Sequence, residues 1–248
     1  MLRIDSLSAK RGGKRILSDI NLMLYPKTIT AVIGKNGCGK STLVDCISQK
    51  LSYDGRITFC EKDLSCIPPR LRAQYISVLP QKLSSPHLTV SELVALGRTP
   101  YLSLTGRLTE RDAEITNRAI DTAGLCDFRE KYSDELSGGE LQRAYLAMIL
   151  AQDTPVMLLD EPTTHLDIDS EYEFLRILTA LRDSHDKSIL CVLHNITLAM
   201  RFADRIAVIS DGALAFSGTR DECAESGVIE RVFNVKKAVS DGNIFYTA

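Results

Sequence analysis

The sequence contains no tryptophan, and aromatic residues of all kinds make up only 6% of it. Its seven cysteines are odd in number and form no Cys-x-x-Cys pair, which argues against a disulfide framework and against a zinc site. No apolar run approaches the about 18 residues that a membrane-spanning helix needs. The first residues also lack the charged-then-apolar pattern of a secretion signal. We therefore expect a soluble, cytoplasmic chain.

The sequence has no excess of positive charge. The formal net charge is −2 and the pI is about 6.1. Because proteins that bind nucleic acids carry a basic field or stripe, this balance predicts no nucleic-acid partner. With 248 residues, 44% of them apolar, the chain can bury the core of one large domain or of a domain with a subdomain.

A glycine-rich segment follows a short apolar run. Residues 29–33 are apolar and largely β-branched, which is typical of a buried strand, and residues 41–47 have apolar positions at helical spacing. Strand, turn and helix are the context in which a Gly-x-x-x-x-Gly-Lys-Ser loop cradles phosphate groups. The residues of this segment are Gly34, Lys35, Asn36, Gly37, Cys38, Gly39, Lys40, Ser41 and Thr42.

The residue types of this loop suit a nucleoside triphosphate. Its glycines let successive backbone N–H groups point at one anion, and the start of the helix adds its positive dipole end. We expect Lys40 to bridge the β- and γ-phosphates, Ser41 to ligate Mg²⁺ and Thr42 to touch the α-phosphate. Cys38 is expected to present its backbone N–H to phosphate, with a redox-sensitive thiol as the alternative.

Two carboxylates follow a second apolar run. Residues 156–159 predict a buried strand, and Asp160 and Glu161 come directly after it. In an open α/β sheet this end of a strand is where ligands bind. Asp160 there suits Mg²⁺, and Glu161 can polarise an attacking water. Taken alone, such a pair is more typical of a helix cap or a salt bridge, but its occurrence with the phosphate loop favours the Mg²⁺ and water-activating roles.

A second small-residue turn precedes another predicted helix. Ser137 is suited to cap that helix, and Gly138 and Gly139 allow the close approach of a phosphate. One triphosphate satisfies the first loop, so the simplest explanation is a head-to-tail dimer. In that dimer the turn of one chain covers the nucleotide of the other.

The chain-long pattern predicts an α/β fold. Residues 2–33 contain strand-like runs, residues 89–152 are helical in pattern, and strands and helices then alternate again to residue 209. Alternation of this kind predicts a parallel sheet with helices on its faces, here interrupted by a helical insert.

Three segments in this order resemble the ATPase subunit of an ABC transporter: residues 34–41, 136–140 and 159–162. The resemblance covers almost the whole chain. It implies a P-loop NTPase (RecA-like) core at 1–86 and 154–248, with an N-terminal antiparallel β subdomain, and an inserted α-helical signature subdomain at 87–153. It also implies ATP and Mg²⁺ as cofactors, and a homodimer in which Ser137, Gly138 and Gly139 act on the nucleotide of the partner.

The resemblance assigns roles to further residues. Gln81 matches a glutamine that senses Mg²⁺ and the membrane partner, with a surface amide after a strand as the alternative. Asp167, in the segment 164–167, matches the acid of a loop that crosses the dimer. His194 matches a switch histidine at the γ-phosphate, and Glu161 and Lys40 complete the expected catalytic set.

Two positions depart from the pattern. Arg11 stands where an aromatic residue often stacks on adenine, so it is expected to stack through its guanidinium plane or to hold the base less tightly. A solvated hairpin tip is the alternative for Arg11 and its basic neighbours. Asn195 follows His194 where an aspartate is common.

Residues 92–101 and 161–167 resemble importers of iron(III)-siderophores, haem and vitamin B12. This likeness implies membrane permease subunits as partners, with an outer substrate-binding protein acting indirectly. It implies a peripheral location at the cytoplasmic face of the plasma membrane. An iron(III)-siderophore or a related iron chelate is the expected substrate, with haem or vitamin B12 as alternatives. A soluble ABC ATPase with an assembly role, as in iron–sulfur cluster biogenesis, is the second hypothesis.

Overall fold

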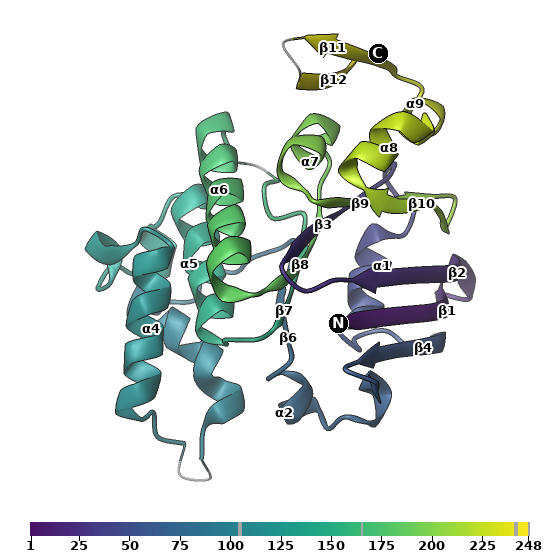
Figure 1. Ribbon diagram of the computed structural model, residues 1–248. Coiled ribbons are helices and arrows are strands. Elements are labelled where there is room, and N and C mark those ends of the chain that lie inside the picture. The colour runs from purple at the N-terminus through teal and green to yellow at the C-terminus, as the bar shows by residue number, and fades with distance from the viewer. Residues whose placement is uncertain (104–105, 165, 241–242, 248) are drawn as a thin grey trace.

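The computed structural model describes residues 1–103, 106–164, 166–240 and 243–247 (Figure 1). Its centre is a six-stranded sheet in the order β10-β9-β3-β8-β7-β6. All neighbouring pairs are parallel except β9 with β10 at one edge. The strands are β3 (Thr28–Ile33), β6 (Ile76–Leu79), β7 (Val156–Asp160), β8 (Ser188–Val192), β9 (Arg205–Ser210) and β10 (Ala213–Thr219).

The first part of the chain forms a second, antiparallel sheet in the order β2-β1-β4-β5. Gly12 and Gly13 turn the chain between its two long strands with positive φ angles of 57° and 79°, which a residue without a side chain adopts at little cost. The apolar residues of this sheet bury one face of it. The strands are β1 (Leu2–Arg11), β2 (Lys14–Leu24), β4 (Tyr53–Phe59) and β5 (Lys62–Asp63).

Helices cover both faces of the central sheet, as the alternating pattern predicted. Residues Ile29, Ala31 and Ile33 of β3 join a core with α5 (Gly138–Ala151), α6 (Ile168–His185) and α7 (Ile196–Phe202). Val32 joins a second core with α1 (Lys40–Ile47) and the antiparallel sheet. Strand β3 thus separates two hydrophobic cores, which is the two-sided burial expected of a parallel strand. In Figure 1 the antiparallel sheet lies on the right and helices α4 and α5 lie on the left.

The helical insert packs mainly through α3, α4 and α5. Thr89, Thr109 and Ser137 each cap the helix that follows with a complete capping box, and the cap at Ser137 is the one expected from the turn that precedes α5. The helices up to this point are α1 (Lys40–Ile47), α2 (Pro69–Arg72), α3 (Val90–Ala95), α4 (Glu110–Thr122) and α5 (Gly138–Ala151). Short 3₁₀ turns lie at η1 (Leu64–Cys66), η2 (Leu96–Tyr101), η3 (Cys126–Phe128) and η4 (Ser133–Glu135).

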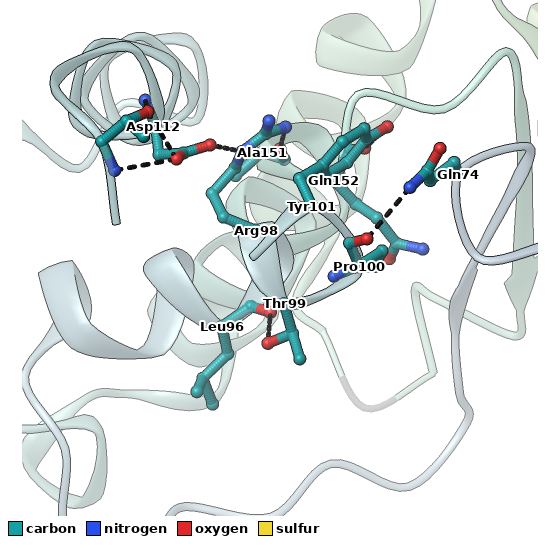
Figure 2. A network of polar contacts seen from close by, with 10 residues as sticks. Gln74, Leu96, Arg98, Thr99, Pro100, Tyr101, Asp112, Ala151 and Gln152 are labelled. Carbon is teal, nitrogen blue, oxygen red and sulfur yellow. Dashed lines mark hydrogen bonds and ion pairs between the residues drawn. The ribbon is translucent and has the colours of Figure 1, made fainter. Parts of the chain in front are cut away.

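Turn η2 is pressed against the carboxyl end of α5. A Cβ atom at Gly97 would lie 2.1 Å from the carbonyl oxygen of Met148, so only glycine fits there. Arg98 is 5% exposed, and it donates from Nε to Asp112 Oδ1 at 2.8 Å and from a terminal nitrogen to the Ala151 carbonyl at 2.7 Å (Figure 2). The buried ion pair with Asp112 joins η2 to α4, and the hydrogen bond to Ala151 joins it to α5.

The same turn reaches the central sheet. The guanidinium carbon of Arg98 lies 4.0 Å from the centroid of the Tyr101 ring. The Tyr101 hydroxyl donates a hydrogen bond to the Gln152 carbonyl at 2.9 Å (Figure 2). The Gln152 side chain donates in turn to the carbonyls of Ala73 and Ile76, at the start of β6. The end of α5 is therefore fixed to the base of the strand that leads to Gln81.

The carboxyl-terminal part adds helices α6 (Ile168–His185), α7 (Ile196–Phe202), α8 (Arg220–Ser226) and α9 (Val228–Phe233), and a hairpin of β11 (Lys236–Ser240) and β12 (Asn243–Thr247). The sequence pattern had not resolved the elements after β9. Among the described residues, no helix has the length and apolarity needed to cross a bilayer.

Candidate active site

A cavity of about 430 Å³ opens at the carboxyl ends of the central strands. It brings together the hairpin tip of the antiparallel sheet, the glycine-rich loop, the segment after β6 and the ends of β7 and β8. Most of the residues predicted from sequence meet here. The lining residues are Arg11, Ile16, Asn36, Gly37, Gly39, Lys40, Ser41, Thr42, Gln81, Glu161 and His194.

The glycine-rich loop is shaped by positions that exclude a side chain. Gly39, directly before α1, has a φ of 111°, and a Cβ atom there would lie 2.5 Å from Leu17 Cδ2. A Cβ atom at Gly34 would lie 2.4 Å from the carbonyl oxygen of Ile209. The Gly34 contact is with a backbone atom that cannot move aside, and the φ of Gly39 is one that residues with a side chain rarely adopt, so the loop depends on glycine at these places.

Lys40 is the first residue of α1 and is 5% exposed. Its ammonium group donates to the carbonyl oxygens of Gly34 at 2.8 Å and Lys35 at 3.2 Å. The loop therefore wraps around the charge of this lysine. A buried ammonium beside free backbone N–H groups at a helix start is an arrangement that attracts phosphate.

Ser41 and Asp160 face each other on the side of the cavity toward β7. The Ser41 hydroxyl donates to Asp160 Oδ1 at 3.1 Å. Burial raises the pKa of the Asp160 carboxyl above its ordinary value, and the neighbouring Glu161 carboxylate adds to that, while the Ser41 hydrogen bond opposes it. A hydroxyl next to a carboxylate is a fitting pair of oxygen ligands for Mg²⁺ that is also held by phosphate oxygens.

No group of three or more His, Cys, Asp or Glu side chains in the described part of the chain could hold a metal ion alone. A partial ligand set fits Mg²⁺, because this ion keeps several waters and binds one or two protein ligands together with substrate phosphates.

Glu161 lies between two other predicted residues. Its Oε2 accepts a hydrogen bond from the Gln81 amide, and its Oε1 lies 2.6 Å from His194 Nε2. Its side chain is only 10% exposed, whereas that of His194 is 42% exposed. Because β6, β7 and β8 are neighbours in the sheet, the residues that follow them meet at one edge. Glu161 also has a φ of 52°, a strained conformation for a residue with a side chain.

Ser137, Gly138, Gly139 and Asp167 do not line this cavity. Ser137 accepts from the Glu140 backbone N–H at 3.3 Å as the cap of α5, and Asp167 accepts from that of Ser170 at 2.7 Å as the cap of α6. These two helix starts are close, since a Cβ atom at Gly139 would lie 3.2 Å from Ser170 Oγ. Of the segment 164–167, residue 165 lies outside the described residues.

Arg11 reaches the cavity from the tip of the first hairpin. Its side chain is 62% exposed and lies 3.5 Å from Asp45 Oδ2, which is a weak ion pair. Ile16, on the strand that follows, also lines the cavity, and the sequence reasoning missed it. Its apolar position directly after a basic hairpin tip was the available signal.

Cys38 is buried within the loop, at 9% exposure. Burial raises the pKa of its thiol, although the nearby Lys40 ammonium opposes the effect. A thiol that stays protonated at neutral pH is a weak nucleophile. These observations favour a packing role for the side chain over a redox-sensitive one.

The ABC transporter family matches residues 17–164. This chain belongs to that family. The resemblance seen in its motifs is thereby confirmed, and the chain is an ABC-type ATPase that acts as the ATP-binding subunit of a transporter.

Curated relatives match along nearly the whole chain. The probable siderophore transport system ATP-binding protein YusV of Bacillus subtilis is 36% identical, over 98% of this chain and 89% of the relative. The petrobactin import ATP-binding protein FpuD of Bacillus anthracis is also 36% identical, over 99% and 91%. The ferric enterobactin transport ATP-binding protein FepC of Escherichia coli is 33% identical, over 97% and 89%.

Solved structures confirm the predicted fold class. An inward-facing putative metal-chelate type ABC transporter matches with a TM-score of 0.84 and 23% identity, over 99% of this chain and 95% of its own. The cbiO1 protein of Clostridium perfringens, part of the transporter complex cbiONQ, matches with a TM-score of 0.81 and 26% identity, over 93% of each chain.

Proposed function

We propose that this ABC ATPase drives uptake of an iron(III)-siderophore or a related iron chelate. The observation that supports this proposal is the set of full-length relatives, whose names refer to siderophore transport, petrobactin import and ferric enterobactin transport. The resemblance of residues 92–101 to importers of iron(III)-siderophores, haem and vitamin B12 also supports the proposal.

We propose that hydrolysis takes place in the cavity at the carboxyl ends of β6, β7 and β8. Lys40 and the loop N–H groups hold the phosphates, and Ser41, Asp160 and Gln81 would hold Mg²⁺. When bound, the ion would neutralise charge that develops on the transferred phosphoryl group. Glu161 orients the attacking water, and His194 stabilises charge near the γ-phosphate.

We propose that two copies of the chain complete two such sites. Ser137, Gly138, Gly139 and Asp167 lie outside the cavity of their own chain, which supports a role for them at the nucleotide of a partner. In the proposed domain division, the core comprises residues 1–86 and 154–248 and the helical subdomain comprises residues 87–153. Each chain would then have two separate surfaces that contact nucleotide. The core holds the triphosphate, and the subdomain presents the Ser137 turn to the other copy.

We propose that the dimer docks on membrane permease subunits at the cytoplasmic face of the plasma membrane. The substrate-binding protein outside the membrane would act on it only through the permease. The names of the relatives support this assembly.

The test is growth on a panel of iron sources after deletion of the gene for this chain. We expect loss of growth on one iron(III) chelate, restored by the wild-type chain and not by Glu161→Gln. A growth defect confined to haem or vitamin B12 would show that one of these, and not an iron(III)-siderophore, is the substrate. Undiminished growth on every source, with the chain recovered on a soluble assembly scaffold, would contradict the importer role.

A further inference from the structure

Two chain segments, one leading into α3 and one lying between α4 and α5, are joined along their backbones. The first, residues 86–91, follows Gln81, and the second, residues 129–134, precedes Ser137. The Val90 and Ser91 N–H groups donate to the carbonyls of Lys131 and Arg129, each at 3.0 Å, and Thr89 pairs with Tyr132 in an antiparallel bridge. We call these two paired segments the loop junction.

Ser133 closes one end of the loop junction. It is completely buried, its N–H donates to the Leu88 carbonyl at 2.8 Å, and its hydroxyl donates to the Pro86 carbonyl. Its buried hydroxyl therefore shares the half-buried Pro86 carbonyl of the opposite segment with the Leu88 N–H, which donates to the same oxygen at 2.7 Å. Replacing Ser133 by alanine therefore removes one of the two hydrogen bonds to the Pro86 carbonyl and leaves a gap at a buried position.

An aromatic stack covers the solvent side of the same junction. The rings of His87 and Tyr132 lie parallel at 4.1 Å, and His87 Nδ1 lies 3.1 Å from Asp134 Oδ2. Ser133 thus lies between two residues that contact His87, so both sides of this short segment are held.

A second tie joins the Gln81 segment to helix α5 itself. The Tyr145 hydroxyl donates to the Ser84 carbonyl at 2.8 Å and lies 3.0 Å from the Ser84 hydroxyl. Helix α5 begins with the Ser137 turn, so Tyr145 and Ser133 both link that turn to the chain that follows Gln81.

We propose that Ser133 is a positioning residue that fixes the Ser137 turn relative to Gln81. Gln81 contacts Glu161 in the cavity of its own chain, whereas the Ser137 turn acts at the site of the partner. Through Ser133, the position of Gln81 at one site sets the position of the turn offered to the other site. This inference rests on the proposed dimeric ATPase.

The experiment compares Ser133→Ala with its parent in two backgrounds. In Glu161→Gln protein, sedimentation with ATP should show a dimer dissociation constant raised about fivefold to tenfold, the loss expected for one buried hydrogen bond. ATP binding to the monomer should stay within about twofold, because the glycine-rich loop is untouched. In the otherwise wild-type chain, kcat should fall by a similar factor with KM for ATP unchanged.

Thr154→Val is the matched control. Thr154 is 1% exposed, and its hydroxyl lies 2.9 Å from the Val156 carbonyl oxygen and 2.8 Å from the Ser77 hydroxyl, so the variant also removes buried hydrogen bonding. It lies at the base of β7, away from the loop junction, and should leave dimerisation and kcat unchanged. An equal loss in both variants would reduce Ser133 to a general contributor to stability and overturn the proposal.

A double mutant tests the coupling directly. If Ser133 acts through Gln81, its substitution should have a much smaller effect in a Gln81→Ala background, whereas independent effects would multiply and overturn the proposal.

Tyr132→Ala, which removes only the exposed stack, should also weaken the dimer, and it replaces Ser133→Ala in these measurements if Ser133→Ala does not fold. If the parent hydrolyses ATP and Ser133→Ala has the same kcat and the same dimer dissociation constant, the role of Ser133 is excluded while the proposed function stands. A parent without ATP turnover would end the proposed function as well.

Discussion

At the scale of single residues, Glu161 is the most constrained group of the site. It is held between Gln81 and His194, has a strained backbone and is nearly buried. Strain that the surrounding structure maintains is a common feature of functional residues. Nothing in the sequence gave that geometry, although the residue type and its place after β7 were predicted.

We predict that Glu161→Gln keeps ATP binding and loses turnover by about 10²–10⁴, the range for loss of a positioned general base. The amide preserves the shape of the side chain but cannot accept the proton of the attacking water. Phosphate release under saturating ATP measures the loss. Glu114→Gln, an exposed substitution on α4, is the control and should hydrolyse at the parental rate. Parental turnover in Glu161→Gln would exclude the proposed role.

The local residue motifs could be predicted because their chemistry depends on few neighbours. The glycine-rich loop, Asp160 and Glu161 are specified by short segments, and each lies where its flanking strand predicted. The contacts among Gln81, Glu161 and His194 join residues far apart in the chain. Such contacts follow from the order of the strands in the sheet, which residue spacing does not determine.

At the scale of helices and strands, the sequence specified helix starts better than sheet edges. Thr89, Thr109 and Ser137 cap their helices through bonds within three residues, so the pattern is visible in a short window. Strand β10 lies at the edge of the central sheet, and β11 and β12 form a separate two-stranded sheet, so burial imposes little pattern on these strands. Turn η2 was also missed, because its shape depends on Gly97 meeting α5.

The buried pair of Arg98 and Asp112 gives a prediction at this scale. Hydrogen bonds from Thr109, followed by the contact with Arg98, lower the pKa of Asp112 from 3.8 to about 2. A carboxyl whose pKa is depressed in the folded state stabilises the fold above its unfolded pKa and loses that contribution as pH falls toward the folded value. The shift corresponds to about 2 kcal/mol at pH 7.

We therefore predict that Asp112→Asn lowers the free energy of unfolding by about 2 kcal/mol at pH 7, and that the deficit shrinks by about 1 kcal/mol at pH 3. Urea unfolding at pH 7, 5 and 3 measures both values. Glu114→Gln on the exposed side of the same helix should show neither effect. A deficit that does not change with pH would mean that packing, rather than charge, holds η2 in place.

At the scale of the whole molecule, the chain has its phosphate cavity on one part of its surface and the Ser137 turn on another. The sequence predicts a second copy of the chain, because it contains two turns suited to phosphate and one full nucleotide loop, and this dimer stays a prediction. It could not predict how the two parts are linked inside one chain, since that link runs through Ser133, Tyr145 and the η2 network.

We predict that Glu161→Gln protein forms a dimer in ATP and that adding Ser137→Arg abolishes the dimer while ATP still binds the monomer. The bulky cation would occupy the place of the γ-phosphate contact at the partner site. Sedimentation velocity with and without ATP separates the species. Thr122→Arg, at the exposed end of α4, should still dimerise. A stable ATP-bound dimer of the Ser137→Arg protein would contradict the shared-site arrangement.

The distance between the Ser137 turn and the cavity of its own chain bears on inheritance as well as on chemistry. In the proposed pair, a chain defective at Lys40 and a chain defective at Ser137 would place both lesions in one nucleotide site and leave the opposite site whole. Two alleles that are each inactive alone would then complement each other in a mixed population of subunits, whereas two alleles with the same lesion would not.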